Sequence, residues 1–291
     1  MTSSILSGRR GSWRRIFDRV MKVLILLSVV IAVIPLVLVV WDVVSQGWIA
    51  ISWSFLTKNP PSPLAGYGGI WNGIVGSALM VGIGTLIAVP IGVGAGIYFS
   101  EWPESRLSFL SSFMNDVLAE FPTIVIGLFV FVLVVEPTRT FSAVAGALAL
   151  AIIMLPIIAR TTEESLKIVP STLREASMAL GIPRWKTIFR VVISTGKSGL
   201  ATGILLGIAR ATGETAPLVL TAGYLEYPPA GLFGPTASIP YIIYNFGTSG
   251  YSNWTTVAWS AALVLVAFML ILNITVRVFI GRKSTGVRAE I

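Results

Sequence analysis

The chain of 291 residues contains no cysteine and no histidine. Without cysteine it has no disulfide and no thiolate metal site, and without histidine it lacks the commonest metal ligand and the usual general base. Charged residues are also scarce, at 12%, whereas soluble domains carry about 25%. An active site would have to rest on Asp, Glu, Lys or Ser alone, so we expect no catalytic residue, no metal ion and no cofactor.

Apolar residues, in contrast, make up 55% of the chain, and the mean hydropathy is +0.85. Because a membrane helix needs about 20 mostly apolar residues, this composition predicts an all-α, multi-spanning membrane protein. The N-terminus does not read as a cleavable signal peptide, since its basic and apolar stretches are long and no small-residue cleavage site follows.

Uncharged runs between charged residues predict six membrane-spanning helices. They lie near residues 22–43, 70–100, 116–136, 140–159, 191–223 and 254–280. The chain thus divides into a basic N-terminal segment (1–21), a first span (22–43), a core with five further spans (70–280) and a short tail (281–291).

Positive charge is concentrated in segments that six spans would place on one side of the membrane. These segments are the N-terminus, residues 160–197 and the C-terminal end, whereas the opposite side has only Lys58 and Arg139. Since cytoplasmic loops are rich in Lys and Arg, we expect a plasma-membrane protein with both termini in the cytoplasm. The net charge of +8 is then a topology signal, which argues against nucleic-acid binding.

A polar stretch, "STLREASMALGIPRWKTIF" at 171–189, interrupts the apolar sequence between the fourth and fifth spans. Thr172 and Glu175 have the spacing of a capping box, and Gly181 with Pro183 ends a helix, so we predict a short helix over 172–181.

One face of this helix, formed by Leu173, Ala176, Ser177 and Leu180, is small and shallow. The face suits a groove on a cytoplasmic partner, but an ordinary interfacial helix, with Glu175 as a cap only, fits the composition equally well.

Two charges, Arg210 and Glu214, fall within the fifth span and four residues apart, so a helix would place them on one face. An unpaired charge at mid-membrane costs at least about 2.5–3.5 kcal/mol, and such residues usually pair or line a polar path. The two residues could form a purely structural pair or a path for an anion. Arg160, at the end of the fourth span, is a third candidate, for which an anchoring role is favoured.

Glycines are dense in the second span, where Gly92 and Gly96 have the GxxxG spacing that allows close helix packing. We expect them to pack within the bundle rather than to form a dimer seam. The Gly-Lys-Ser at 196–198 resembles the end of a nucleotide-binding loop, but the glycine required at position 191 is Val. ATP would therefore have to be hydrolysed by another chain.

The segment "EASMALG" at 175–181 resembles the EAA loop of bacterial and archaeal ABC importer permeases, with Ser177 in place of the second Ala and no Pro at position 194. Further motifs, among them "GIARATGETAPLVLTAG" and "ASIPYIIYNF", resemble the PstA-type phosphate permease family. Gly213 to Pro217 separates the chain from the sister PstC type. Glu120 departs from the small residue expected before "FPTIVIG".

This resemblance implies a type I ABC importer (MetI-like) permease fold and a permease subunit of an ATP-driven phosphate importer, not an enzyme. In the family this loop is a coupling helix that docks on the ATPase. The resemblance therefore implies an ATPase-docking role for Leu173, Glu175, Ala176, Ser177, Leu180 and Gly181. The implied partners are a PstC-type permease, two PstB-type ATPase copies, a PstS-type extracytoplasmic binding protein and membrane lipid. Import of molybdate, sulfate or phosphonate remains an alternative, and an ion-driven secondary transporter a more distant one.

Overall fold

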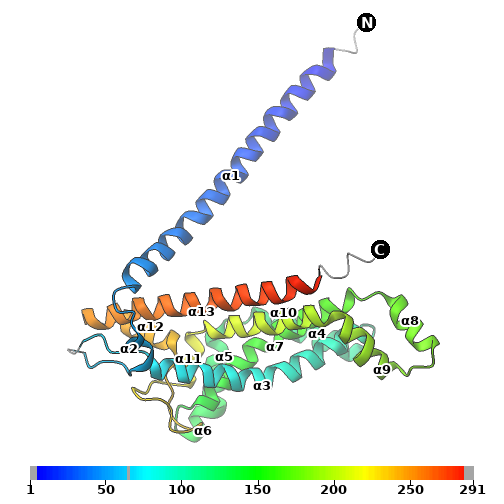
Figure 1. Ribbon diagram of the computed structural model, residues 1–291. Helices are drawn as coiled ribbons and strands as arrows, with labels where there is room; N and C mark the ends of the chain where they lie inside the picture. Colours follow the sequence, from blue (N-terminus) through cyan, green and yellow to red (C-terminus); the bar gives the residue numbers. More distant parts are fainter. Residues whose placement is uncertain (1–4, 64–65, 285–291) are drawn as a thin grey trace.

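The computed structural model describes residues 5–63 and 66–284, and the chain is built from helices (Figure 1). Residues 1–4 of the predicted basic segment, and residues 285–291 of the predicted tail, lie outside these ranges. The helices are α1 (Ile5–Gly47), α2 (Trp53–Thr57), α3 (Trp71–Glu101), α4 (Arg106–Glu120), α5 (Thr123–Val130), α6 (Glu136–Thr138), α7 (Ala143–Lys167), α8 (Ser171–Ala179), α9 (Arg184–Thr187), α10 (Ile193–Thr212), α11 (Ala216–Thr221), α12 (Ile239–Gly247) and α13 (Ser252–Ser284), with π-helical turns η1 (Phe131–Val135) and η2 (Ile188–Val192).

Five helical segments are long and apolar enough to cross a membrane, and a sixth results if the bent pair formed by α4 and α5–α6 is counted as one span. The five are Ile16–Gly47, Trp71–Glu101, Ala143–Lys167, Arg184–Thr212 and Ser252–Thr275. The prediction of an all-α, multi-spanning protein is therefore confirmed.

The centre of the bundle is the pair α3 and α7, whose side chains form the largest group of buried apolar residues with parts of α10 and α11. Gly92 and Gly96 face α7. A β-carbon added at Gly96 would lie 2.5 Å from the carbonyl oxygen of Ala159, and one at Gly92 would lie 3.0 Å from Ile158. The two glycines thus let the helices touch, as predicted for packing within the bundle.

The third span is not the continuous helix expected from about Asp116. Helix α4 ends at Glu120, and the chain turns by 104° before α5 begins at Thr123. Pro122 explains the break, because a proline disfavours the helical conformation of the residue before it. Phe121 is accordingly extended, with φ −64° and ψ 134°.

The fifth span was expected to run to about Gly223, but α10 ends at Thr212. Gly213 follows as the C-terminal cap, and the separate helix α11 then begins at Ala216 with Pro217 in its first turn. A proline within a continuous helix would remove one backbone hydrogen bond and clash with the preceding turn, which accounts for the break.

Helix α1 leaves the bundle at an angle, and among the described helices its main contact is with α13, near the C-terminal end of α1 (Figure 1). The contact is close there, since the Ser260 hydroxyl donates to the carbonyl of Gly47 at 2.7 Å. Along the rest of the span the apolar side chains are exposed in the single chain. A helix that is apolar on all sides is typical of a membrane span.

Candidate coupling surface and membrane charges

Helix α8, which contains the predicted docking face, projects with α9 from one end of the bundle (Figure 1). It begins one residue earlier than predicted, at Ser171, after the cap residue Pro170. No side chain caps this end, so the capping box predicted from Thr172 and Glu175 does not form. Thr172 already lies inside the helix, and Glu175 is exposed, which leaves its carboxylate available at the surface.

The other end of α8 is built as predicted, with Gly181 closing the helix. Gly181 has φ +77°, a conformation that costs a residue with a side chain roughly 1–2 kcal/mol. Its N–H donates to the carbonyl of Met178 at 2.9 Å, and the N–H of Ile182 donates to that of Ser177 at 3.3 Å. These two bonds form a Schellman motif, which turns the chain from α8 toward α9.

The predicted docking face is only partly available. Leu173 and Leu180 are exposed, at 42% and 81%, and Ala176 lies beside them at the surface. Ser177, in contrast, is buried, and its hydroxyl forms a 2.9 Å hydrogen bond with that of Thr187 in α9. Ser177 therefore fixes α8 to α9 instead of belonging to the open face, because the turn at Gly181 folds α9 back against it.

A second attachment of α8 was not predicted from the sequence. Arg174 forms an ion pair with Glu101 at the end of α3, with Nη2 2.9 Å from Oε1. Arg184 of α9 donates to the Glu101 carbonyl at 2.6 Å and lies over the ring of Trp102. The sequence gives only one hint of this cluster, namely the acidic Glu101 and the aromatic Trp102 at the end of an apolar span.

Arg210 and Glu214 form an ion pair, as their spacing predicted. They do not share a continuous helix, since Glu214 lies just beyond the end of α10. The Glu214 side chain is 6% exposed, whereas that of Arg210 is 54% exposed. The carboxylate is thus buried against the bundle, and the guanidinium projects from it with most of its N–H donors free of Glu214.

Arg160 belongs to a separate cluster on α7. Its guanidinium lies 3.2 Å from the carboxylates of both Glu163 and Glu164. The buried Glu163 also accepts from the ammonium group of Lys167 at 2.6 Å. Two acidic groups thus compensate two basic ones within two turns of one helix, and the structure does not bring Arg160 together with Arg210.

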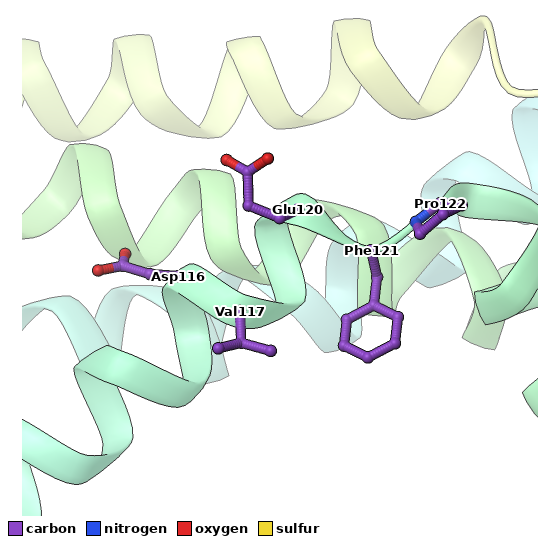
Figure 2. Close-up of a pocket in the computed structure, with 5 residues that line it drawn as sticks. All are labelled: Asp116, Val117, Glu120, Phe121 and Pro122. Atoms are coloured by element: carbon purple, nitrogen blue, oxygen red, sulfur yellow. The ribbon is translucent and has the colours of Figure 1, made fainter.

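The bend between α4 and α5 carries the acidic residue that departs from the family pattern. Asp116, Val117, Glu120, Phe121 and Pro122 line a hollow of about 470 Å³ at this point. Figure 2 shows the carboxylate of Glu120 and the ring of Phe121 pointing in opposite directions at this bend. Among the described residues there is no group of three or more acidic side chains placed to hold a metal ion.

Together these features define a membrane-spanning helical bundle with an exposed polar helix at one end. The family described as "Binding-protein-dependent transport system inner membrane component" matches residues 88–285. A solved structure of the MetNI methionine ABC transporter in an inward-facing conformation has a similar fold, with a TM-score of 0.59 at 19% identity, and covers 73% of this chain and 93% of that chain.

Full-length relatives narrow the assignment. A phosphate transport system permease protein PstA of Pasteurella multocida is 39% identical over 93% of this chain and 97% of that protein. A PstA of Haemophilus influenzae is 40% identical over 94% and 98%, and PstA 1 of Mycobacterium tuberculosis is 39% identical over 90% and 88%. The chain belongs to the PstA family of binding-protein-dependent inner-membrane permeases, and it is a multi-pass membrane protein.

Proposed function

We propose that this chain forms half of the translocation pathway of an ATP-driven phosphate importer. The observation that carries the proposal is the exposed helix α8, closed by Gly181, in a chain that matches PstA permeases over nearly its whole length. A PstC-type permease would supply the other half of the pathway. Two PstB-type ATPase copies would act from the cytoplasm, and a PstS-type binding protein would deliver phosphate from outside.

The docking surface for the ATPase is the exposed side of α8. Leu173, Glu175, Ala176 and Leu180 provide an apolar patch with one acidic group. Gly181 belongs to this surface through its shape, because a β-carbon there would meet no other atom within 4 Å. A groove on the ATPase could therefore approach the backbone closely at this position.

The membrane part of the pathway contains Arg210, with Glu214 as its permanent counter-ion. A guanidinium offers planar pairs of N–H donors that match phosphate oxygens. The buried Glu214 reduces the cost of keeping Arg210 in the membrane, and it weakens phosphate binding enough to allow release. Arg160 is assigned an anchoring role at the cytoplasmic side, because Glu163 and Glu164 already compensate its charge.

The orientation follows from the distribution of basic residues, with α8, α9 and both termini in the cytoplasm. The loops between α11 and α12 and around α2 would then face the binding protein. Docking of the ATPase on α8 and delivery of phosphate at the opposite end are separate events, and they influence each other through the bundle. Such coupling between distant sites is reciprocal, so phosphate delivery should also stimulate ATP hydrolysis.

The test is ATP-dependent uptake of labelled phosphate by vesicles that contain the full set of subunits. We expect Arg210→Gln to leave the complex assembled and to abolish uptake. Gly181→Asp should remove the ATPase from the complex, because it adds a bulky charge to the docking surface. Lys197→Gln is the matched control for Arg210, since it removes an exposed positive charge from the same helix. Phosphate uptake without any ATPase subunit would refute the proposal.

A further inference from the structure

A single side chain, Arg174, ties the exposed helix α8 to two membrane helices. Its Nε and Nη2 donate to Glu101 Oε1 at 3.0 and 2.9 Å. Its Nη1 donates to the Val169 carbonyl at 2.6 Å, and Nη2 also donates to the Leu166 carbonyl at 3.0 Å. These four hydrogen bonds join α8 to the end of α3 and to the end of α7.

Glu101, the partner of Arg174, is itself fixed by burial and by a second arginine. Glu101 is the last residue of α3, and its side chain is 4% exposed, against 20% for Arg174. The main chain at the same residue accepts from Arg184, whose guanidinium also lies 4.8 Å from the centre of the Trp102 ring. The end of α3 is therefore bound to both short helices that project from the bundle.

The backbone of α8 packs on α9 and η2, and the Arg174–Glu101 bridge is its direct side-chain link to α3. A second, longer route passes through the turn at Gly181 to α9, which contacts the end of α3 through Arg184 and continues through the π-turn at 188–192 into α10. Helices α3 and α7, in contrast, are interlocked by the glycine contacts at Gly92 and Gly96. A movement of α8 that passes through Arg174 is thus delivered to α3 and α7, which pack on each other more extensively than any other pair of described helices.

We propose that the Glu101–Arg174 pair is a positioning device that makes α8 move as one body with α3 and α7, so that movement of the docked ATPase reaches the membrane helices. The proposal rests on the proposed function, because it needs an ATPase docked on α8. Arg174 and Glu101 touch neither the substrate nor the nucleotide in this scheme. Their loss uncouples ATP hydrolysis from transport while docking remains.

The chemistry of the pair decides which substitutions test it. Removing Arg174 entirely would leave a buried carboxylate without its partner, which is strongly destabilising in general. Arg174→Lys keeps the charge but cannot reproduce the bridge of four hydrogen bonds, because an ammonium group is a compact point charge. Glu101→Gln keeps the shape and removes the charge. Lys186→Gln is the control, since it removes a half-buried cation that forms no ion pair with Glu101 from neighbouring α9.

The experiment uses the complete complex, reconstituted in lipid vesicles with its ATPase and phosphate-binding protein. Three quantities are measured for each variant: ATPase binding to the complex, the rate of ATP hydrolysis, and phosphate transported per ATP hydrolysed. We expect binding and hydrolysis to stay near wild type for Arg174→Lys and Glu101→Gln. Phosphate transported per ATP should fall by about fivefold or more, the lower end of ordinary coupling between sites. A merely structural role would lower all three together.

A covalent replacement keeps the test decisive if the single variants fold poorly. The chain has no cysteine, so the double variant Glu101→Cys and Arg174→Cys can be joined selectively by a short bismaleimide. Joining the two positions should restore phosphate transport per ATP, and the same reagent on either single-cysteine variant should not.

The proposal is overturned if the ratio is unchanged in folded Arg174→Lys and Glu101→Gln, or if the joined double variant stays uncoupled. The proposed function would fail differently, because Gly181→Asp would then leave ATPase binding intact.

Discussion

Gly94 and Gly96 provide a sharp test of how the central helix pair is held together. Both lie in α3, two residues apart, and differ in what surrounds them. A β-carbon at Gly94 would meet no atom within 4 Å, whereas one at Gly96 would lie 2.5 Å from the Ala159 carbonyl oxygen and 2.6 Å from the Thr162 β-carbon. Alanine therefore has the same effect on helix propensity at the two sites, but it disturbs packing only at Gly96.

The expected magnitudes follow from these contacts. Gly94→Ala should raise the free energy of unfolding by about 0.5–1 kcal/mol, since glycine in a helix is disfavoured by that amount. At Gly96 the clash involves a backbone carbonyl, so α3 must move away from α7. Overpacking of this kind costs about 1–3 kcal/mol, which exceeds the gain in propensity, and Gly96→Ala should be destabilising.

The measurement is the free energy of unfolding in mixed detergent micelles, followed by tryptophan fluorescence. The difference between the two variants is more informative than either value, because the detergent affects both equally. We expect Gly94→Ala to be more stable than Gly96→Ala by at least about 1 kcal/mol. Equal stabilities would refute the reasoning that close approach of α3 and α7 requires glycine at position 96.

Three further predictions concern single contacts. Gly181→Ala should destabilise the end of α8 by about 1 kcal/mol, and Gly181→Asn should destabilise it less, because asparagine tolerates positive φ. Hydrogen exchange of the α8 amides distinguishes the two variants, and equal protection in both would contradict this account. Ser177→Ala should cost about 1–3 kcal/mol by leaving the buried Thr187 hydroxyl unpaired, and adding Thr187→Val should recover part of that loss in a double-mutant cycle. Burial, helped by the nearby Glu226 charge, raises the pKa of the Tyr224 phenol to about 12, against about 10 in an unfolded chain. The contribution of the neutral phenol to stability is therefore fully present below about pH 10 and is lost as the pH rises through about 12. Tyr224→Phe should remove this loss, so the midpoint of thermal unfolding should fall less steeply at alkaline pH in the variant than in the wild type.

The helical core was predictable because each span leaves a long apolar run, and because GxxxG spacing identifies close packing. The breaks inside the spans were not. Whether the chain bends at Pro122 or continues depends on what neighbouring elements can satisfy the freed backbone groups. The same holds for the end of α10 at Thr212, where an apolar run continues through Gly213 and Pro217 although the helix does not. Hydropathy reports the composition of a segment and not the path of its backbone.

The candidate site shows the same division between local and distant contacts. The pairing of Arg210 with Glu214 could be predicted since it needs only a spacing of four residues. The pairing of Arg174 with Glu101 joins residues 73 positions apart, and nothing in the sequence specifies that separation. Ser177 was placed on the exposed face by helical periodicity, and its burial results from α9, which folds back on α8 after the turn at Gly181.

The two interrupted spans also contact each other, and they do so in the segments that follow their breaks. Helix α5, after the bend at Pro122, packs on α11, after the break at Gly213. A β-carbon at Gly127 would lie 2.6 Å from the α-carbon of Pro217, so the contact is backbone against backbone. Backbone groups freed at membrane depth persist only where protein or water satisfies them.

The charges of the membrane region lie beside these same breaks. Arg210 is in the last turn of α10, where a positive charge complements the helix dipole, and Glu120 ends α4, where a negative charge does not. Glu120 is exposed in the single chain, so it needs water or a cationic group from a neighbouring subunit. We therefore expect this carboxylate, like the Arg210 guanidinium, to face the proposed translocation pathway rather than lipid.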